Sequence, residues 1–357
     1  MKQPKNYHEQ KIIDNTLKLR ELLKGMPIFT KDYFRAIEPT TSAKTRISYA
    51  YDIRVFFRFL LESNPIYKNH SLIDFTHQDL EKVTPQDLEE YLEYLKLYKS
   101  TDTNSSAEYV TNSEKGIARK MSAIRSFYAY YFKHQIIEKN PTVLVDMPKL
   151  HEKAIVRLDT DEVAELLDYV EHCGDTLTGQ KKMYYEKTKY RDLAIMTLLL
   201  GTGIRVSECV GLDISDLNFK NGSMKVTRKG GNEMIIYFGL EVQKAIENYL
   251  EKSRKGTTAL PDHENALFLS SQRKRMGVQS VENMVKKYAK QVTPNKKITP
   301  HKLRSTYGTA LYKETGDIYL VADVLGHKDV NTTRKHYAAI GEERRRRAAS
   351  AVQLRGK

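Results

Sequence analysis

Cysteine is scarce in this chain of 357 residues, which contains only Cys173 and Cys209. Two cysteines show neither metal-ligand spacing nor a disulfide framework, and they fit a reducing compartment. The chain also lacks an apolar run of eighteen residues, and its longest apolar stretch, residues 193–200, predicts a buried helix rather than a membrane span. The first residues, MKQPKNYHEQK, lack a secretory hydrophobic region. We therefore expect a cytoplasmic protein without a membrane span.

Positive charge, in contrast, is abundant. Lysine and arginine together number 59 against 45 acidic residues, which gives a formal charge of +14 and a pI near 9.4. This surplus favours a polyanionic partner such as nucleic acid, because a basic surface gains affinity by releasing counterions from the phosphate backbone. On charge alone, general solubility explains the surplus equally well. The length, with 40% apolar residues, predicts two domains.

The first 100 residues show the apolar spacing of helices. Apolar residues recur at helical intervals over residues 1–27 and again over residues 42–62. Thr84 followed by Pro85 is typical of a capped helix start and predicts a helix through about Leu97. The polar residues 100–106 predict a loop. Arginines interleaved in the second segment are predicted to face solvent: Arg46, Arg54 and Arg58.

Residues 116–134, GIARKMSAIRSFYAYYFKH, predict a strongly amphipathic helix. The apolar side is expected to be buried and comprises Ile117, Met121, Ile124, Phe127, Tyr128 and Tyr131. The basic residues on the other side are expected to lie mostly outside, and they are Arg119, Lys120, Arg125 and Lys133.

The prolines near residues 141–156 predict an extended basic linker, because residues before proline avoid helical geometry. Asp159, with Glu162 three residues later, predicts a capped helix start. The polar, lysine-rich residues 174–189 predict a loop or a loosely held turn, and residues 191–200 predict an apolar helix.

Two basic residues follow the next predicted elements. Arg205 comes just after the apolar helix and Thr202-Gly203. The β-branched residues around Val226 and 234–238, separated by Gly-Gly-Asn, predict a hairpin with Lys229 at its turn end. Helices are expected to dominate the remainder of the chain.

The segment 299–340 gathers polar groups suited to phosphate chemistry. His301 and Arg304 are three residues apart, so on a helix both project from one face. His327 directly follows a Leu-Gly pair, where glycine typically ends a helix, and Tyr337 comes ten residues later. Each feature alone is weak, since an H-x-x-R pair is usually solvated and the chain has 23 tyrosines.

Their order is more informative. An arginine in LLLGTGIRVSECVGLDISDL, a lysine in MKVTRKGGNEMIIYF, and then H-x-x-R, histidine and tyrosine resemble the signature of the tyrosine recombinase (lambda-integrase-like) family. The resemblance extends over residues 190–340. Within the family, the length, the YRDLAIMTLLL helix and the TRKGG turn are most similar to Xer-type (XerS-like) recombinases, and a simple mobile-element integrase is the alternative.

The resemblance implies roles for these residues. Arg205 and Arg304 would clamp the scissile phosphate, because guanidinium groups form paired hydrogen bonds with phosphate oxygens and keep their charge. Tyr337 would be the nucleophile that forms a covalent 3′-phosphotyrosine, and Lys229 would protonate the leaving 5′ oxygen.

Three further residues complete the implied site. His301 would exchange a proton with the tyrosine or hydrogen-bond the phosphate, and His327 would donate to a non-bridging oxygen. Glu208, three residues after Arg205, would orient that arginine, although an ordinary surface salt bridge explains it nearly as well. The scheme needs no cofactor: side chains supply the cations, the acidic and histidine residues form no metal-ligand cluster, and the chain has no G-x-x-x-x-G-K-[ST] loop for ATP.

The implied fold is mainly α, with an N-terminal helical core-binding (SAM-like) bundle and a C-terminal, mostly helical catalytic domain with a small β-sheet, forming a C-shaped clamp on DNA. The expected parts are an N-terminal helical extension (1–27), the core-binding domain (28–140), the linker (141–156), the catalytic domain (157–340) and a basic tail (341–357). Arg119, Lys120 and Arg125 would bind DNA, with phosphate contacts from Lys120 and Arg125. The tail would link subunits, contact DNA or be a solvated end.

The implied function is site-specific recombination through a phosphotyrosine intermediate and a Holliday junction, with chromosome dimer resolution as its task. The partner would be double-stranded DNA with inverted-repeat sites. On this DNA the protein would bind a pair of half-sites as a monomer or dimer and assemble into a homotetramer. Phage or transposon integration, a catalytically silent DNA-binding protein and a type IB topoisomerase-like relaxase are the alternatives.

Overall fold

The computed structural model describes residues 7–99, 109–151, 156–228, 231–326 and 330. The chain divides into two compact units, residues 1–153 and 154–357. Both are mainly helical with small sheets, which confirms the predicted fold class. No helix within the described ranges is long and apolar enough to traverse a lipid bilayer.

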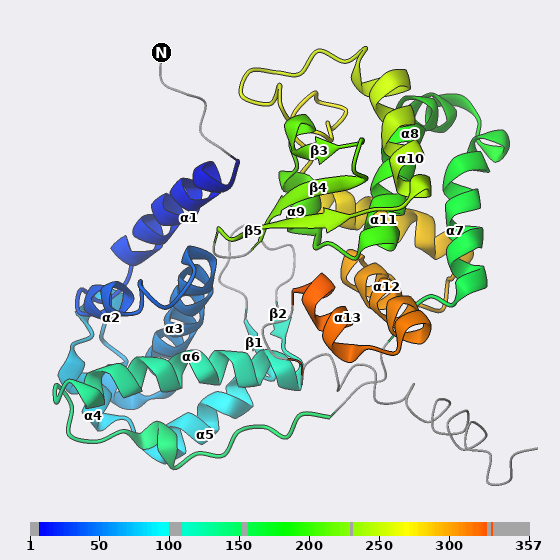
Figure 1. Ribbon diagram of the computed structural model, residues 1–357. Coiled ribbons are helices and arrows are strands. Elements are labelled where there is room, and N and C mark those ends of the chain that lie inside the picture. The colour runs from blue at the N-terminus through cyan, green and yellow to red at the C-terminus, as the bar shows by residue number, and fades with distance from the viewer. Residues whose placement is uncertain (1–6, 100–108, 152–155, 229–230, 327–329, 331–357) are drawn as a thin grey trace, which may run out of the picture. The chain divides into compact units, whose positions relative to one another are not determined.

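The first unit is a helical bundle with a small antiparallel hairpin (Figure 1). Helix α3 packs against both α1 and α6. Because Leu19 of α1 and nearby Met26 are buried in the core of this unit, the N-terminal helix packs as part of the bundle. The elements are α1 (Tyr7–Lys24), α2 (Thr30–Ala36), α3 (Ala43–Ser63), α4 (His77–Lys82), α5 (Pro85–Tyr94), β1 (Leu97–Lys99), β2 (Tyr109–Thr111) and α6 (Glu114–Lys133), with 3₁₀ turns at Pro65–Tyr67, Leu72–Asp74 and Pro141–Val143.

Aromatic side chains fill the core of the first unit. The ring centroid of Phe57 lies 4.8 Å from that of Phe75 and 6.1 Å from that of Phe127, and all three rings are buried. Such edge-to-face and tilted pairs stabilise a core beyond the burial of their area. The six apolar residues predicted to lie inside α6 are all buried, because they recur at helical spacing on one face.

Two basic residues of this unit, Lys120 and Arg46, are less exposed than predicted, whereas Arg119 and Lys133 are exposed as predicted. Lys120 is only 8% exposed, and its Nζ donates to Asp52 Oδ1 over 3.1 Å, so the expectation that it lies outside is wrong. Arg46 is also buried, with Nη1 donating to Glu38 Oε1 over 2.6 Å. Long basic side chains can be buried when a carboxylate compensates their charge.

Two segment boundaries also differ from the expectation. The helix expected to reach about Leu97 ends at Tyr94, and Leu97 instead begins β1, where it pairs with Thr111. The expected loop at 100–106 lies outside the described residues. In the expected linker, Thr142 and Val145 are buried, so its first residues pack against the bundle.

The Asp79 carboxylate caps the start of helix α4. Asp79 Oδ2 accepts hydrogen bonds from the backbone N and Oγ1 of Thr76, both over 2.9 Å, and Oδ1 accepts from Lys82 Nζ over 2.9 Å. Burial alone would raise the pKa of Asp79, but these hydrogen bonds and the ammonium charge lower it below the ordinary value. Ionised Asp79 therefore stabilises this helix start.

The second unit surrounds helix α8, which packs against α7, α10 and α12 (Figure 1). Its three-stranded antiparallel sheet has the order β3-β4-β5, with Ser223 opposite Tyr237 and Thr227 opposite Glu233. The elements are α7 (Thr160–His172), α8 (Gly179–Thr202), α9 (Val206–Gly211), β3 (Leu217–Asn218), β4 (Ser223–Thr227), β5 (Glu233–Tyr237), α10 (Leu240–Tyr249), α11 (Val278–Val292), α12 (Pro300–Thr315) and α13 (Ile318–Leu325), with 3₁₀ turns at Cys173–Thr176 and Ile214–Asp216 and a π-helical turn at Leu250–Arg254.

The start of α8 corrects another expectation. Residues 179–189, expected to be a loop, form the first turns of this helix. Tyr185 and Thr188 are buried, and the Tyr185 hydroxyl donates to the Val170 carbonyl over 3.3 Å. A few inward-facing side chains thus hold the polar first turns of this helix, whose second half is apolar and buried. The predicted capping of α7 is present, with Asp159 N donating to Glu162 Oε2 over 2.7 Å.

Candidate active site

Arg205 lies at the junction of α8 and α9, where it is the residue preceding the first turn of α9. Its backbone N donates to Glu208 Oε2 over 2.8 Å, and its Nη1 donates to Glu208 Oε1 over 2.9 Å. The Glu208 side chain is 3% exposed, whereas that of Arg205 is 36% exposed. The carboxylate is therefore in a position to orient the guanidinium group while leaving part of it open to solvent.

The far end of α9 is held by a second arginine. Arg275 Nη1 donates to the Val210 carbonyl over 3.1 Å and to the Leu212 carbonyl over 2.8 Å, and Nη2 contacts Asp213. Carbonyls at a helix C-terminus have no intrahelical partners, so these bonds satisfy them. Helix α9, which carries Glu208, is thus fixed at both ends.

Arg304 comes from the second turn of α12 and is 4% exposed. Its Nη1 donates to the Gly203 carbonyl at the end of α8 over 2.6 Å, and its Nη2 donates to the Leu325 carbonyl at the end of α13. One guanidinium group therefore joins α12 to the end of α8, 101 positions earlier, and to the end of α13, the next helix in the chain.

The last turn of α13 brings the arginines together. This helix ends at Gly326, which has a left-handed backbone with φ 61°. Arg205 Nη2 donates to the Gly326 carbonyl over 3.3 Å, next to the Leu325 carbonyl bound by Arg304. The structure thus brings the two predicted phosphate-binding arginines to adjacent peptide groups. Positive groups are favoured at this helix end by its partial negative charge.

A third arginine, which sequence reasoning missed, reaches the same turn. Arg228 Nη2 donates to the Val324 carbonyl over 2.8 Å. Burial lowers the pKa of Arg228; the charge of Arg205 acts in the same direction, whereas the carboxylate of Glu208 opposes it. The only signal in the sequence was the position of Arg228 directly before Lys229, and nothing in its spacing distinguished it among 59 basic residues.

His301 lies in the first turn of α12, one helical turn before Arg304, and its residue is exposed. The expected H-x-x-R helix is therefore present. Lys229, His327, Tyr337 and the tail at 341–357 lie outside the described residues. No cluster of three or more histidine, cysteine or acidic side chains suited to a metal ion occurs among the residues described.

The predicted DNA-binding residues of the first unit have unequal access to a ligand. Arg119 has a side chain 49% exposed and donates from Nη2 to Asp52 Oδ1 over 2.9 Å. Lys120 is buried against the same carboxylate, and Arg125 Nη2 donates to the Val145 carbonyl over 2.5 Å. Of these three, Arg119 offers the most exposed charge.

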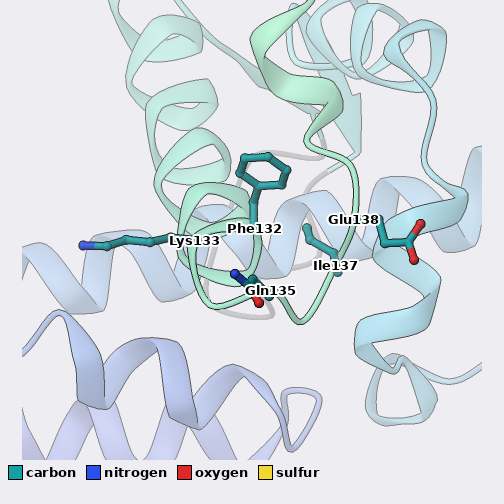
Figure 2. A pocket seen from close by; sticks show the side chains of 5 residues that line it. All are labelled: Phe132, Lys133, Gln135, Ile137 and Glu138. Atoms are coloured by element: carbon teal, nitrogen blue, oxygen red, sulfur yellow. The ribbon is translucent and has the colours of Figure 1, made fainter.

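The first unit also contains a shallow pocket at the end of α6 (Figure 2). The side chains around it do not converge, and Lys133 points away from Glu138 (Figure 2). This pocket therefore presents no constellation of catalytic groups. Its lining consists of Phe132, Lys133, Gln135, Ile137 and Glu138.

Family models match most of the chain. The model described as "Phage integrase family" matches residues 156–344, and that described as "Phage integrase, N-terminal SAM-like domain" matches residues 31–135. The chain belongs to the phage integrase family. As the sequence resemblance predicted, this family member is a tyrosine recombinase of the Xer type, an enzyme that cuts and rejoins DNA strands in site-specific recombination.

Relatives extend over nearly the whole recombinase. Tyrosine recombinase XerS of Streptococcus uberis is 31% identical over 92% of this chain and 96% of its own. Tyrosine recombinase XerC of Caldanaerobacter subterraneus subsp. tengcongensis is 33% identical over 95% of this chain and 90% of its own.

Solved structures share the fold. The XerH site-specific recombinase bound to a palindromic difH substrate, a post-cleavage complex, has a TM-score of 0.59 at 18% identity, covering 84% of this chain and 80% of its own. A lambda integrase dimer bound to a COC′ core site has a TM-score of 0.59 at 16% identity, covering 86% and 93%.

Proposed function

We propose that this recombinase cleaves DNA through a covalent 3′-phosphotyrosine, with Arg205 and Arg304 holding the scissile phosphate. The observation that supports this most is that the two guanidinium groups, from separate helices, bind adjacent carbonyls at the end of α13. Glu208 fixes the orientation of Arg205 through two hydrogen bonds. Fixed cations stabilise the charge that develops on a phosphate in the transition state without having to reorganise.

The proposed reaction is an exchange of phosphodiester bonds. The Tyr337 oxygen forms a bond to phosphorus, the bond from phosphorus to the 5′ oxygen breaks, and Lys229 gives a proton to that oxygen. His301 exchanges a proton with the tyrosine or hydrogen-bonds the phosphate, and His327 donates a hydrogen bond to a non-bridging oxygen. The 5′ hydroxyl of another strand then reverses the step, so the phosphotyrosine conserves the bond energy.

The proposed substrate is double-stranded DNA with inverted-repeat sites. The first unit would contribute phosphate contacts, of which Arg119 has the most exposed side chain among the predicted residues. A monomer or dimer on a pair of half-sites would assemble into a homotetramer at two sites, with residues 341–357 linking subunits. The cytoplasm, where chromosomal DNA is accessible, is the proposed location.

Chromosome dimer resolution is the proposed biological task. Relatives named XerS and XerC at 31–33% identity span more than nine-tenths of this chain, which supports an Xer-type role. The alternative is integration of a mobile element, because a Tn1549 transposon integrase shares the fold with a TM-score of 0.59 at 20% identity.

A covalent adduct tests the chemistry. Wild-type protein and Tyr337→Phe are incubated with nicked duplexes carrying chromosome-dimer-resolution sites or sequences that flank its gene, and the products are separated on denaturing gels. The wild type is expected to form an adduct that is lost in Tyr337→Phe while DNA binding persists. Tight binding without an adduct on every duplex would support a silent DNA-binding protein instead. Relaxation of supercoils by a monomer, without strand exchange, would support a relaxase.

A second variant tests the phosphate clamp. Arg205→Lys keeps the charge but removes the planar donor pair, so cleavage is expected to fall about 10²- to 10³-fold, as for the loss of one oxyanion donor. Arg35→Lys is the matched control, because this arginine is 77% exposed and its partner Asp32 is 55% exposed. Equal cleavage rates for the two variants would contradict the proposed clamp.

A further inference from the structure

Arg228 follows β4 directly and reaches the last turn of α13. Its Nη2 donates to the Val324 carbonyl over 2.8 Å, across 96 positions in the chain. The guanidinium group also packs against Gly326 so closely that a Cβ at this position would overlap it. The residue after β4 thus binds the C-terminal end of α13.

A simple capping role explains this arrangement poorly. Arg304 and Arg205 already donate to the next two carbonyls of the same turn. The Nε of Arg228 is buried and has no hydrogen-bond partner among the described residues, which leaves part of its desolvation uncompensated. A third guanidinium group beside Arg205 adds repulsion, which Glu208 and Asp323 partly counter. As a helix cap alone, Arg228 would therefore add little net stability to the fold.

The residues that follow Arg228 and Gly326 in the chain suggest a role for their contact. Arg228 is joined by a peptide bond to Lys229, and Gly326 is joined to His327. The contact therefore joins the residue before Lys229 to the residue before His327. In the proposed mechanism, Lys229 protonates the leaving oxygen and His327 contacts the phosphate.

We propose that Arg228 is a positioning residue for DNA cleavage, which sets the backbone before Lys229 by binding the end of α13. The inference rests on the proposed function. It predicts a specific defect in protonation of the leaving group, because small displacements of a catalytic group from its working geometry slow a reaction by up to about 10²-fold.

The test compares two nicked duplexes, one with an ordinary scissile phosphate and one with sulfur in place of the bridging 5′ oxygen. A thiolate leaves without a proton, so this substrate does not need the general acid. Arg228→Ala is expected to cleave the ordinary duplex about 10- to 100-fold more slowly than wild type and the sulfur duplex at close to the wild-type rate. Lys229→Ala is expected to show the same pattern, whereas Arg205→Ala is expected to be slow on both.

Lys225→Ala is the matched control. Lys225 lies on β4, the strand that Arg228 follows, and its replacement also removes one positive charge, but its side chain is 47% exposed and pairs with exposed Glu233. We expect wild-type rates from this variant on both duplexes. Arg228→Gln keeps an amide donor for the Val324 carbonyl and serves where Arg228→Ala fails to fold; its rate on the ordinary duplex is expected to lie between those of Arg228→Ala and wild type.

Two results would overturn the inference. Wild-type cleavage of the ordinary duplex by folded Arg228→Ala or Arg228→Gln would reduce Arg228 to a helix cap. Equal slowing on both duplexes would show that Arg228 stabilises the charge of the phosphate and has no part in protonation of the leaving group. Failure of the proposed function is distinguishable, because the wild type itself would then form no adduct on either duplex.

Discussion

Replacing Gly326 by alanine should dislodge Arg228 from α13. Gly326 has φ 61°, and a Cβ at this position would overlap the Arg228 guanidinium group. The guanidinium group lies at the end of a flexible side chain, so it can move away, but it then loses its 2.8 Å hydrogen bond to the Val324 carbonyl. The substitution therefore acts in two ways, through backbone strain and through a lost contact.

The two contributions have different magnitudes. A left-handed backbone costs a non-glycine residue about 1–2 kcal/mol. A hydrogen bond from a charged donor contributes about 1.5–3 kcal/mol. Gly326→Ala should thus lower the free energy of unfolding of the second unit by about 2.5–5 kcal/mol in the wild type. In an Arg228→Ala background only the backbone cost of about 1–2 kcal/mol remains.

Hydrogen exchange of α8 peptides across a denaturant series measures this free energy for the second unit alone, since two units need not unfold together. Gly179→Ala is the control, because Gly179 has φ 56° and no atom within 4 Å of an added Cβ, so its cost should be the same in both backgrounds. A coupling energy between Gly326→Ala and Arg228→Ala below about 0.5 kcal/mol, the usual limit of additivity, would refute the contact.

Three other regions give separate predictions. Asp52→Asn should destabilise the first unit by about 3 kcal/mol in denaturant unfolding, because Lys120 keeps a buried charge without its carboxylate; a loss below about 0.5 kcal/mol would contradict this. Burial raises the pKa of the Cys209 thiol to about 12 and that of Cys173 above its ordinary value, so a thiol reagent at pH 8 should modify both only after unfolding; fast labelling of the native protein would show open access. Asp79→Asn should cost about 1 kcal/mol at pH 7, and because the folded pKa of Asp79 is lowered, the difference from wild type should shrink as pH falls below 3.8; a difference independent of pH would contradict it.

Local patterns in the sequence were sufficient for much of the fold. The inner face of α6 and the capping of α7 by Asp159 and Glu162 depend on residues within one or two turns, and both are as predicted. The hairpin of β4 and β5 follows from its β-branched residues and its glycines. The contact of Arg205 with Glu208 follows from their spacing of three residues at the start of α9.

Contacts between distant segments could not be predicted in this way. Lys120 is buried because Asp52, 68 positions earlier, supplies a carboxylate, and no helical period encodes that pairing. The start of α8 is polar in sequence, and it is helical because a few residues such as Tyr185 pack inward. Arg228 lies in the site through a bond to Val324, 96 positions later, so only the folded chain reveals it.

The large sequence separation of the arginine contacts has a consequence for folding during synthesis. Arg205 binds a carbonyl 121 positions later in the chain, and Arg304 joins carbonyls 101 positions before it and 21 after it. Chains fold from the N-terminus as they are synthesised, and contacts of large sequence separation form late. The proposed phosphate clamp therefore cannot be completed on a nascent chain until α13 has emerged.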